Sequence, residues 1–228
     1  WHLFACGAGA DLAAFGDEAA ISHGQGLMGE REAVLVAWGA NERSRTPASL
    51  RALERAAEAV PAFGLGQILL GEAALVRALR RRDAGAGLLE EAVPALHRLV
   101  SADPEHADSP IEKALSLFHR GRVELALPAV LGRRHRGALA LEQALAMMAQ
   151  CEIPEFDAAA RALLSANARL ALGRCLAEAG RLEQARTYFK EAAAVDPEGP
   201  IGAVVREDLD LLDRSPPHAR DMRVPQNK

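Results

Sequence analysis

One segment of the chain, residues 166–199, constrains the fold more than any other. It consists of an apolar run, a glycine turn at Gly180, a second apolar run and a terminating proline at Pro197. Apolar side chains recur along both runs at intervals of three and four residues, which is the period of an α-helix. The segment therefore predicts an antiparallel pair of helices that packs on its neighbours.

The composition of the chain favours the same fold class. Of its 228 residues, 50% are hydrophobic but only 4% are aromatic. The core must then be built mainly from alanine, leucine and valine, which suits closely packed helices better than sheets. With 27 basic and 31 acidic residues, the net charge is −4. Nucleic acids and anionic membranes select for a basic excess, so we expect neither as the main partner.

Start signals and spacing indicate further helices of the same kind. Thr46 and Ser109 are each followed by proline, the pattern of an N-cap residue with proline in the first helical turn. Equivalent large apolar residues then recur in four second helices, at steps of 43, 45 and 48 residues. These residues are Leu53, Leu96, Leu141 and Phe189. We therefore expect four consecutive helix pairs.

Residues 166–199 closely resemble a tetratricopeptide (TPR) repeat, a helix pair that stacks on the next pair. The family motif falls on Leu172, Gly173, Leu176, Gly180, Ala185, Phe189, Ala192 and Pro197. Arg169 replaces the family's aromatic residue, and Leu176 replaces its usual tyrosine. A standard repeat spans about 34 residues, so the longer steps imply longer helices and loops.

The resemblance implies an all-α solenoid of about four TPR-like helix pairs with a C-terminal capping helix. We expect the repeat domain over residues 28–213, after an N-terminal helical segment (1–27) and before a disordered tail (214–228). The apolar face of the capping helix would cover the last pair. That face consists of Ile201, Val204, Val205, Leu209 and Leu212.

The resemblance also implies a function, because TPR proteins bind other proteins far more often than they catalyse reactions. We expect a non-catalytic scaffold or adaptor that holds a protein or peptide partner. The first helices would line its groove, and Arg169, Arg174 and Glu178 are candidate groove residues by resemblance.

A second candidate surface is the arginine cluster Arg133, Arg134 and Arg136. Arginines at the end of a helix, such as those at residues 80–82, are explained by the helix dipole. The second cluster precedes its helix and lacks that explanation. Because guanidinium groups bind carboxylates in a bidentate manner, we expect this cluster to bind an acidic peptide segment.

The sequence contains no catalytic, cofactor or metal motif such as H-E-x-x-H, G-x-S-x-G or G-x-x-x-x-G-K. Arginines flank His119 and His135, which disfavours a metal, so we expect both histidines on a solvated surface. Trp38 follows an apolar run, and we expect it to be buried. We predict no catalytic, cofactor-binding or metal-binding residues.

Two alternatives remain open. Residues 3–6 resemble the end of a bacterial lipoprotein signal, so the chain is alternatively an exported accessory subunit of a transport system, membrane-attached only if Cys6 is lipidated. The chain begins with Trp1 rather than Met, so it is alternatively the helical-repeat part of a larger enzyme or regulator. We favour a cytoplasmic protein.

Overall fold

The computed structural model describes residues 29–80, 87–127, 129–150 and 158–214, and every regular element within them is a helix. The α-helices are α2 (Glu30–Ser44), α3 (Pro47–Ala59), α4 (Gly64–Arg80), α5 (Gly87–Ser101), α6 (Pro110–Ala126), α7 (Arg134–Gln150), α8 (Ala158–Glu178), α9 (Leu182–Ala193) and α10 (Pro200–Arg214). Two short 3-10 turns, η2 (Pro104–His106) and η3 (Ala129–Leu131), flank α6. The predicted all-α fold class, with four helix pairs and a capping helix, is confirmed. The predicted N-terminal segment and nearly all of the predicted tail lie outside the described residues.

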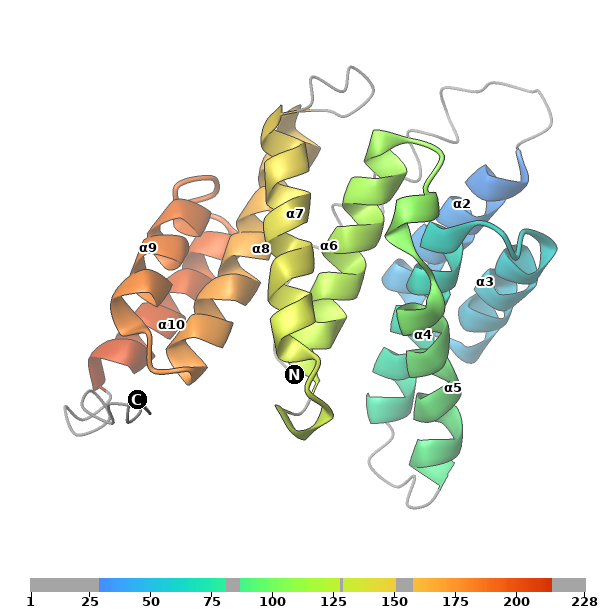
Figure 1. Ribbon diagram of the computed structural model, residues 1–228, viewed down its shortest axis with the longest axis horizontal. Helices are drawn as coiled ribbons and strands as arrows, with labels where there is room; N and C mark the ends of the chain where they lie inside the picture. The colour runs from blue at the N-terminus through green and yellow to red at the C-terminus, as the bar shows by residue number, and fades with distance from the viewer. Residues whose placement is uncertain (1–28, 81–86, 128, 151–157, 215–228) are drawn as a thin grey trace, which may run out of the picture. The chain divides into compact units, whose positions relative to one another are not determined.

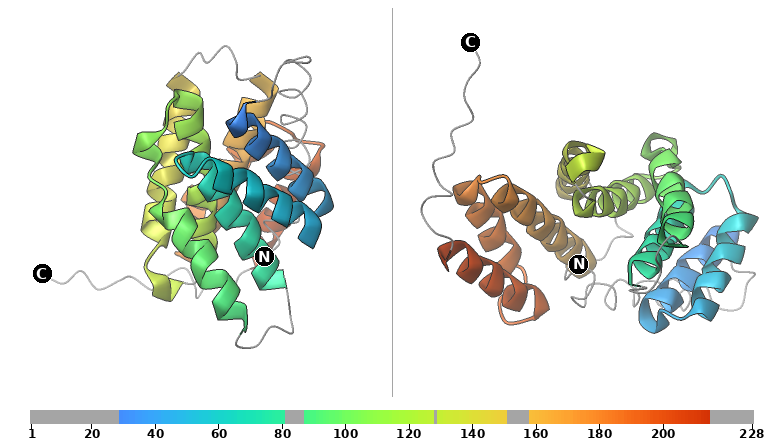
Figure 2. Two further views of the ribbon diagram at one scale, coloured as in Figure 1. Left: turned by 90° about the vertical axis from the view of Figure 1, so that its right-hand side faces the viewer. Right: turned by 90° about the horizontal axis from the view of Figure 1, so that it is seen from below.

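The chain divides into two compact units, residues 1–161 and 162–228. Unit 1 contains the pairs α2/α3, α4/α5 and α6/α7, and α4 also packs against α2, α3 and α6. Its hairpins therefore lie beside one another in chain order (Figures 1 and 2). Unit 2 contains the pair α8/α9, from residue 162 of α8 onward, together with α10.

The predicted helix starts at Thr46 and Ser109 are confirmed. The Thr46 hydroxyl accepts a hydrogen bond from the Ser49 backbone N–H (3.1 Å), and the Ser49 hydroxyl accepts one from the Thr46 N–H (3.0 Å). Ser109 accepts in the same way from the Glu112 N–H (3.1 Å). Each cap satisfies a backbone donor that the first helical turn leaves without a partner.

The core of unit 1 fills the space between its helix pairs with leucine, alanine and a few aromatic side chains. Trp38, predicted to be buried, is only 8% exposed and packs with Leu53 and Leu69. Helices α6 and α7 come close together at Gly121 and Gly137, where a Cβ atom added to Gly137 would lie 2.8 Å from the Gly121 carbonyl oxygen. Only glycine allows these two backbones to come so close.

In unit 2, the turn between α8 and α9 contains Gly180, whose φ of 75° lies in the left-handed region that favours glycine. The ring of Phe189 lies against Gly173, where an added Cβ would be 2.6 Å from a ring carbon. Helix α10 buries Ile201, Val205 and Leu212 in the same cluster as Phe189. The predicted capping helix therefore covers the apolar face of the last pair.

Candidate functional site

A cluster of polar and charged side chains joins the first helices of the three pairs in unit 1, and His119 on α6 is one of its members. The prediction that His119 lies on a solvated surface was wrong, because this residue is only 3% exposed. Its Nδ1 lies 2.6 Å from Oε2 of Glu72 on α4, and its ring packs edge-on against Trp38 with centroids 5.3 Å apart. An acidic partner on another helix thus compensates the burial of the imidazole. His135, by contrast, is exposed as predicted.

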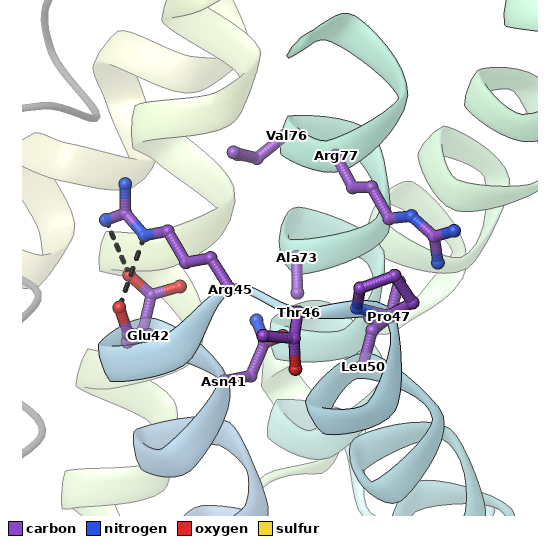
Figure 3. Close-up of a pocket in the computed structure, with 9 residues that line it drawn as sticks. All are labelled: Asn41, Glu42, Arg45, Thr46, Pro47, Leu50, Ala73, Val76 and Arg77. Atoms are coloured by element: carbon purple, nitrogen blue, oxygen red, sulfur yellow. Dashed lines mark hydrogen bonds and ion pairs between the residues drawn. The ribbon is translucent and has the colours of Figure 1, made fainter. Parts of the chain in front are cut away.

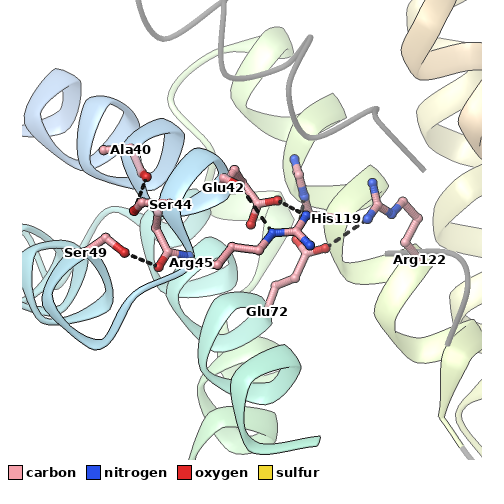
Figure 4. Close-up of polar contacts among 9 residues, drawn as sticks. Ala40, Glu42, Ser44, Arg45, Ser49, Glu72, His119 and Arg122 are labelled. Atoms are coloured by element: carbon pink, nitrogen blue, oxygen red, sulfur yellow. Dashed lines mark hydrogen bonds and ion pairs between the residues drawn. The ribbon is translucent and has the colours of Figure 1, made fainter. Parts of the chain in front are cut away.

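Glu72 is a buried carboxylate held by two basic groups. Besides His119, the guanidinium of Arg122 lies 3.2 Å from Oε1 of Glu72 and 5.2 Å from the ring centroid of Phe118 (Figure 4). Burial acts to raise the pKa of Glu72, but His119 and Arg122 outweigh it, so the pKa is lower than its usual value. Glu72 therefore stays ionised inside the helix layer.

Glu42, at the C-terminal end of α2, is the second carboxylate of this cluster. Its Oε2 lies 3.3 Å from the Arg45 guanidinium (Figure 4). Burial and the negative charge of Glu72 raise the pKa of Glu42, and the nearby basic groups offset this only in part. The two carboxylates thus have opposite tendencies: Glu72 favours its charged form, whereas Glu42 binds a proton more readily than an ordinary glutamate.

A pocket of about 470 Å³ lies next to Glu42, where α2 ends, α3 begins and the middle of α4 passes (Figure 3). Its lining residues are Asn41, Glu42, Arg45, Thr46, Pro47, Leu50, Ala73, Val76 and Arg77. This volume falls within the range of pockets that bind small molecules or side chains. The lining combines aliphatic surface with a few polar groups, which is the composition of a binding pocket rather than of a packing defect.

The pocket presents hydrogen-bond donors from two elements. Asn41 is only 6% exposed, and its Oδ1 accepts a hydrogen bond from the Ser49 hydroxyl (3.1 Å). The same hydroxyl lies closer to the Thr46 carbonyl oxygen (2.9 Å), so its single proton is shared between two acceptors, and the carboxamide of Asn41 can both donate to and accept from a ligand. The half-buried Arg77 has no hydrogen bond or ion pair with any residue that the structure describes. Figure 3 shows Arg45 turned toward Glu42, with Arg77 on the other side, beside Pro47.

The arginine cluster predicted as an acidic-peptide site lies at the start of α7. Arg133 is 3.5 Å from Oε1 of Glu124, a fully buried carboxylate of α6 that also pairs with Arg120 at 3.2 Å. Arg134 donates to the Leu127 carbonyl (3.3 Å), and Arg136 is exposed. Arg133 therefore has an internal role, the neutralisation of a buried charge, that the sequence did not reveal.

The candidate groove residues of unit 2 are engaged within the chain. The guanidinium of Arg174 makes a bidentate pair with Asp208 of α10, at 2.7 and 3.2 Å. Arg169 pairs with Glu191 of α9 at 3.0 Å, and Glu178 is exposed at the end of α8.

The residues of the repeat motif fall into three groups by burial. Those that are buried are Leu172, Gly173, Ala185, Phe189 and Ala192. Leu176 is half-buried in the same core, and Gly180 and Pro197 are exposed in the turns that follow α8 and α9.

The residues that form this site were not predicted from the sequence: Asn41, Glu42, Arg45, Glu72 and Arg77. A signal was present in α4, where Glu72 is the one acidic residue in a mainly apolar helix. An isolated carboxylate in such a helix requires a partner, but the sequence does not indicate which residue supplies it.

The described part of the chain contains no group of three or more histidine, cysteine, aspartate or glutamate side chains that could hold a metal ion. Within the same residues, no helix has the length and apolar character needed to cross a membrane.

Comparison with known proteins gives one positive result. The family model described as tetratricopeptide repeat matches residues 77–133 and 130–200, which together are more than half of the chain. These ranges include the pair α6/α7 and the pair α8/α9. No curated protein and no solved structure matches the chain.

Proposed function

The chain belongs to the tetratricopeptide repeat family, and we propose that it is a non-catalytic scaffold or adaptor that holds a protein partner at the pocket between α2, α3 and α4. Helical repeats of this family are protein-interaction scaffolds in general. For this chain we propose, in addition, where the partner binds and what kind of segment it inserts.

The observation that carries the proposal is the position and lining of the pocket. It opens beside the first helices of unit 1, and it combines an aliphatic wall with Asn41, Arg45 and Arg77. An extended peptide can place an apolar side chain against Leu50 and Val76 while its polar groups bond to the donors around them. Binding sites commonly combine an apolar lining with a few polar groups that orient the ligand.

Site-specific photo-crosslinking tests this proposal. A photoreactive phenylalanine analogue in place of Val76 lies in the pocket, and the same analogue in place of Leu211 lies on the exposed side of α10. In an extract of the source cells, we expect a defined set of crosslinked proteins from position 76 and not from position 211. Absence of specific products from position 76 would contradict the proposal.

The turn before α7 is a second candidate contact, because apolar and basic side chains are exposed there together. Val130 is 89% exposed, and Arg136 is exposed six residues later. We propose that an acidic segment with an apolar residue binds here, with Arg133 and Arg134 beside it. The double variant Val130→Ser/Arg136→Glu changes this surface without removing the partner of Glu124, and it should weaken partner binding if the surface is used.

The groove residues of unit 2 remain proposed contacts for the same partner. A ligand at Arg169 or Arg174 would have to compete with Glu191 or Asp208, so Glu178 is the most accessible of the three.

Cys6 lies outside the described residues, and the alternative of an exported lipoprotein is tested by mass spectrometry of the acylated cysteine. The complete reading frame tests the alternative of a larger enzyme or regulator.

A further inference from the structure

We propose that the chain binds a second copy of itself, through a parallel contact between the outward face of α7 on one copy and the outward face of α10 on the other. This inference rests on the second contact proposed above, because Arg136 belongs to both, and it names the acidic segment that binds there. The two faces are the α7 surface (Arg136, Leu139 and Glu142) and the α10 surface (Glu207, Leu211 and Arg214).

The α7 surface is an exposed stripe along one side of the helix. Arg136 and Glu142 are exposed, and Leu139 between them is 44% exposed. Residues three apart share a helix face, whereas the buried residues Leu141 and Ala144 lie on the other side of α7. The stripe is therefore an exposed apolar residue with a cation about one turn before it and an anion about one turn after it.

The α10 surface has the reverse order of charge. Leu211 is 57% exposed, with the exposed Glu207 four residues before it and the exposed Arg214 three residues after it. The opposite side of α10 packs in the core cluster of unit 2, so the stripe itself is not used there. Arg214 lies 3.9 Å from Asp210, but both side chains are well exposed, and such a contact contributes little.

The two stripes match in charge when the helices run parallel. With the two exposed leucines opposite each other, Arg136 lies about 4.5 Å before them along its helix axis and Glu207 lies about 6 Å before them. Glu142 and Arg214 each lie about 4.5 Å after them. A cation thus meets an anion on each side of a leucine pair, and the long side chains span the small offset.

Other arrangements of the same helices are less favourable or can be separated by experiment. An antiparallel contact between α7 and α10 would place Arg136 beside Arg214 and would likewise bring two glutamates together, and like charges oppose binding. A pair of α10 helices would bring one exposed Asp210 next to the other near the centre of the contact. An antiparallel pair of α7 helices would also match its charges, and mixing of variants separates that pairing from the proposed one.

A contact of one helix with another is small, so we expect a weak and reversible association. Its ion pairs are exposed, and salt screens such pairs. Self-association should therefore increase with protein concentration and decrease as salt is added. Because the two surfaces differ, a single contact leaves one α7 surface and one α10 surface unoccupied.

Sedimentation velocity on the full chain and on two matched double variants tests the proposal. Arg136→Gln/Leu139→Ser removes the α7 surface, and Glu207→Gln/Leu211→Ser removes the α10 surface. We expect the unmodified protein to associate and each variant alone to associate at least about tenfold more weakly. An equimolar mixture of the two variants should form a complex of one copy of each and nothing larger, because one intact surface of each kind remains. Formation of that complex also shows that both variants are folded.

The control is Val93→Ser/Arg98→Gln, which makes the same kind of change at exposed positions of α5. This variant should associate as the unmodified protein does. A photoreactive residue in place of Leu211 should crosslink to a second copy of the chain, which is distinct from the set of proteins expected from position 76.

Three results would overturn the inference: an unmodified protein that stays monomeric at every concentration, a variant that still associates fully by itself, or a mixture that forms anything other than the one-to-one complex. Full association of Glu207→Gln/Leu211→Ser alone would indicate pairing of two α7 helices instead. None of these results bears on the pocket, whose residues lie on or between α2, α3 and α4, so crosslinking from position 76 decides the proposed function separately.

Discussion

The Nδ1 of His119 lies 2.6 Å from the Oε2 of Glu72, a contact that joins α6 to α4 between residues 47 positions apart. Arg122 binds the other oxygen of the same carboxylate at 3.2 Å. Because these groups come from the first helices of successive pairs, the contact fixes how one hairpin sits on the next. The same carboxylate acts electrostatically on Glu42, which lines the pocket.

Replacement of Glu72 by glutamine should destabilise the protein. The variant leaves the basic groups of His119 and Arg122 in a buried site without their carboxylate, and loss of one member of such a pair costs about 3 kcal/mol or more. Urea denaturation followed by circular dichroism measures the change. Glu58→Gln, on the exposed surface of α3, is the matched control and should lie within about 0.5 kcal/mol of the unmodified protein.

The protein should lose stability at acid pH, and part of this loss should depend on Glu72. Its pKa is lower in the folded chain than its ordinary value of 4.5, so its contribution is present above pH 4.5 and is lost as pH falls from there through the folded pKa. The unmodified protein should therefore lose stability more steeply than Glu72→Gln below pH 4.5. Parallel curves for the two proteins would contradict this assignment.

Glu42→Gln should have the opposite effect at neutral pH. The pKa of Glu42 is raised in the folded chain, so its favourable contribution is present below pH 4.5 and is lost as pH rises through the folded pKa. Glutamine removes the unfavourable ionised form, and its gain in stability over the unmodified protein should be larger at pH 7 than at pH 4. The contact with Arg45 offsets little of this gain, since the arginine is partly exposed. Thermal melts at the two pH values compare the proteins.

Gly137→Ala should separate α6 from α7. The added methyl group would lie 2.8 Å from both the Gly121 carbonyl oxygen and the Leu125 backbone nitrogen, and backbone atoms cannot yield as a side chain can. Overpacking of this kind costs about 1–3 kcal/mol. Gly64→Ala is the control, because the nearest atom to its added Cβ is 3.9 Å away. That variant should be neutral or slightly stabilising in the same denaturation assay.

Gly173→Ala should destabilise unit 2 through the ring of Phe189, which lies 2.6 Å from the position of the added methyl group. The smaller side chain of Phe189→Leu makes room for it. The double variant should therefore be less destabilised than the sum of the two single variants, and a double-mutant cycle measures that difference. Simple additivity would show that the two residues do not compete for the same space.

The helix pairs could be predicted from the sequence because their signals are local. Thr46 and Ser109 act within one helical turn, and Gly180 determines its own turn by adopting a positive φ. The apolar period of each helix likewise depends on near neighbours in the chain. Such features can be recognised in the sequence without knowing which residues pack against the helix.

The pocket and its charged cluster could not be predicted in the same way. Glu72 and His119 each stand in an amphipathic helix that contains other polar residues, and nothing local indicates that these two face each other. The arginines that flank His119 suggested exposure, yet Arg122 binds the same buried carboxylate as the imidazole. Arg133 was likewise interpreted without Glu124, its partner on the preceding helix. Pairing across helices depends on crossing angles and register, which side-chain spacing alone does not fix.

Helix α10 is tied to α8 by the bidentate pair between Arg174 and Asp208, and its buried apolar residues belong to the same core cluster as Phe189. In a shortened protein that stops after α9, the Arg174 guanidinium would lack Asp208, and the apolar face of the α8/α9 pair would be exposed. Such an exposed apolar surface promotes self-association. Fragments designed to isolate the last helix pair should therefore extend through Arg214, and aggregation of shorter ones would reflect the missing cover rather than a defect in the hairpin itself.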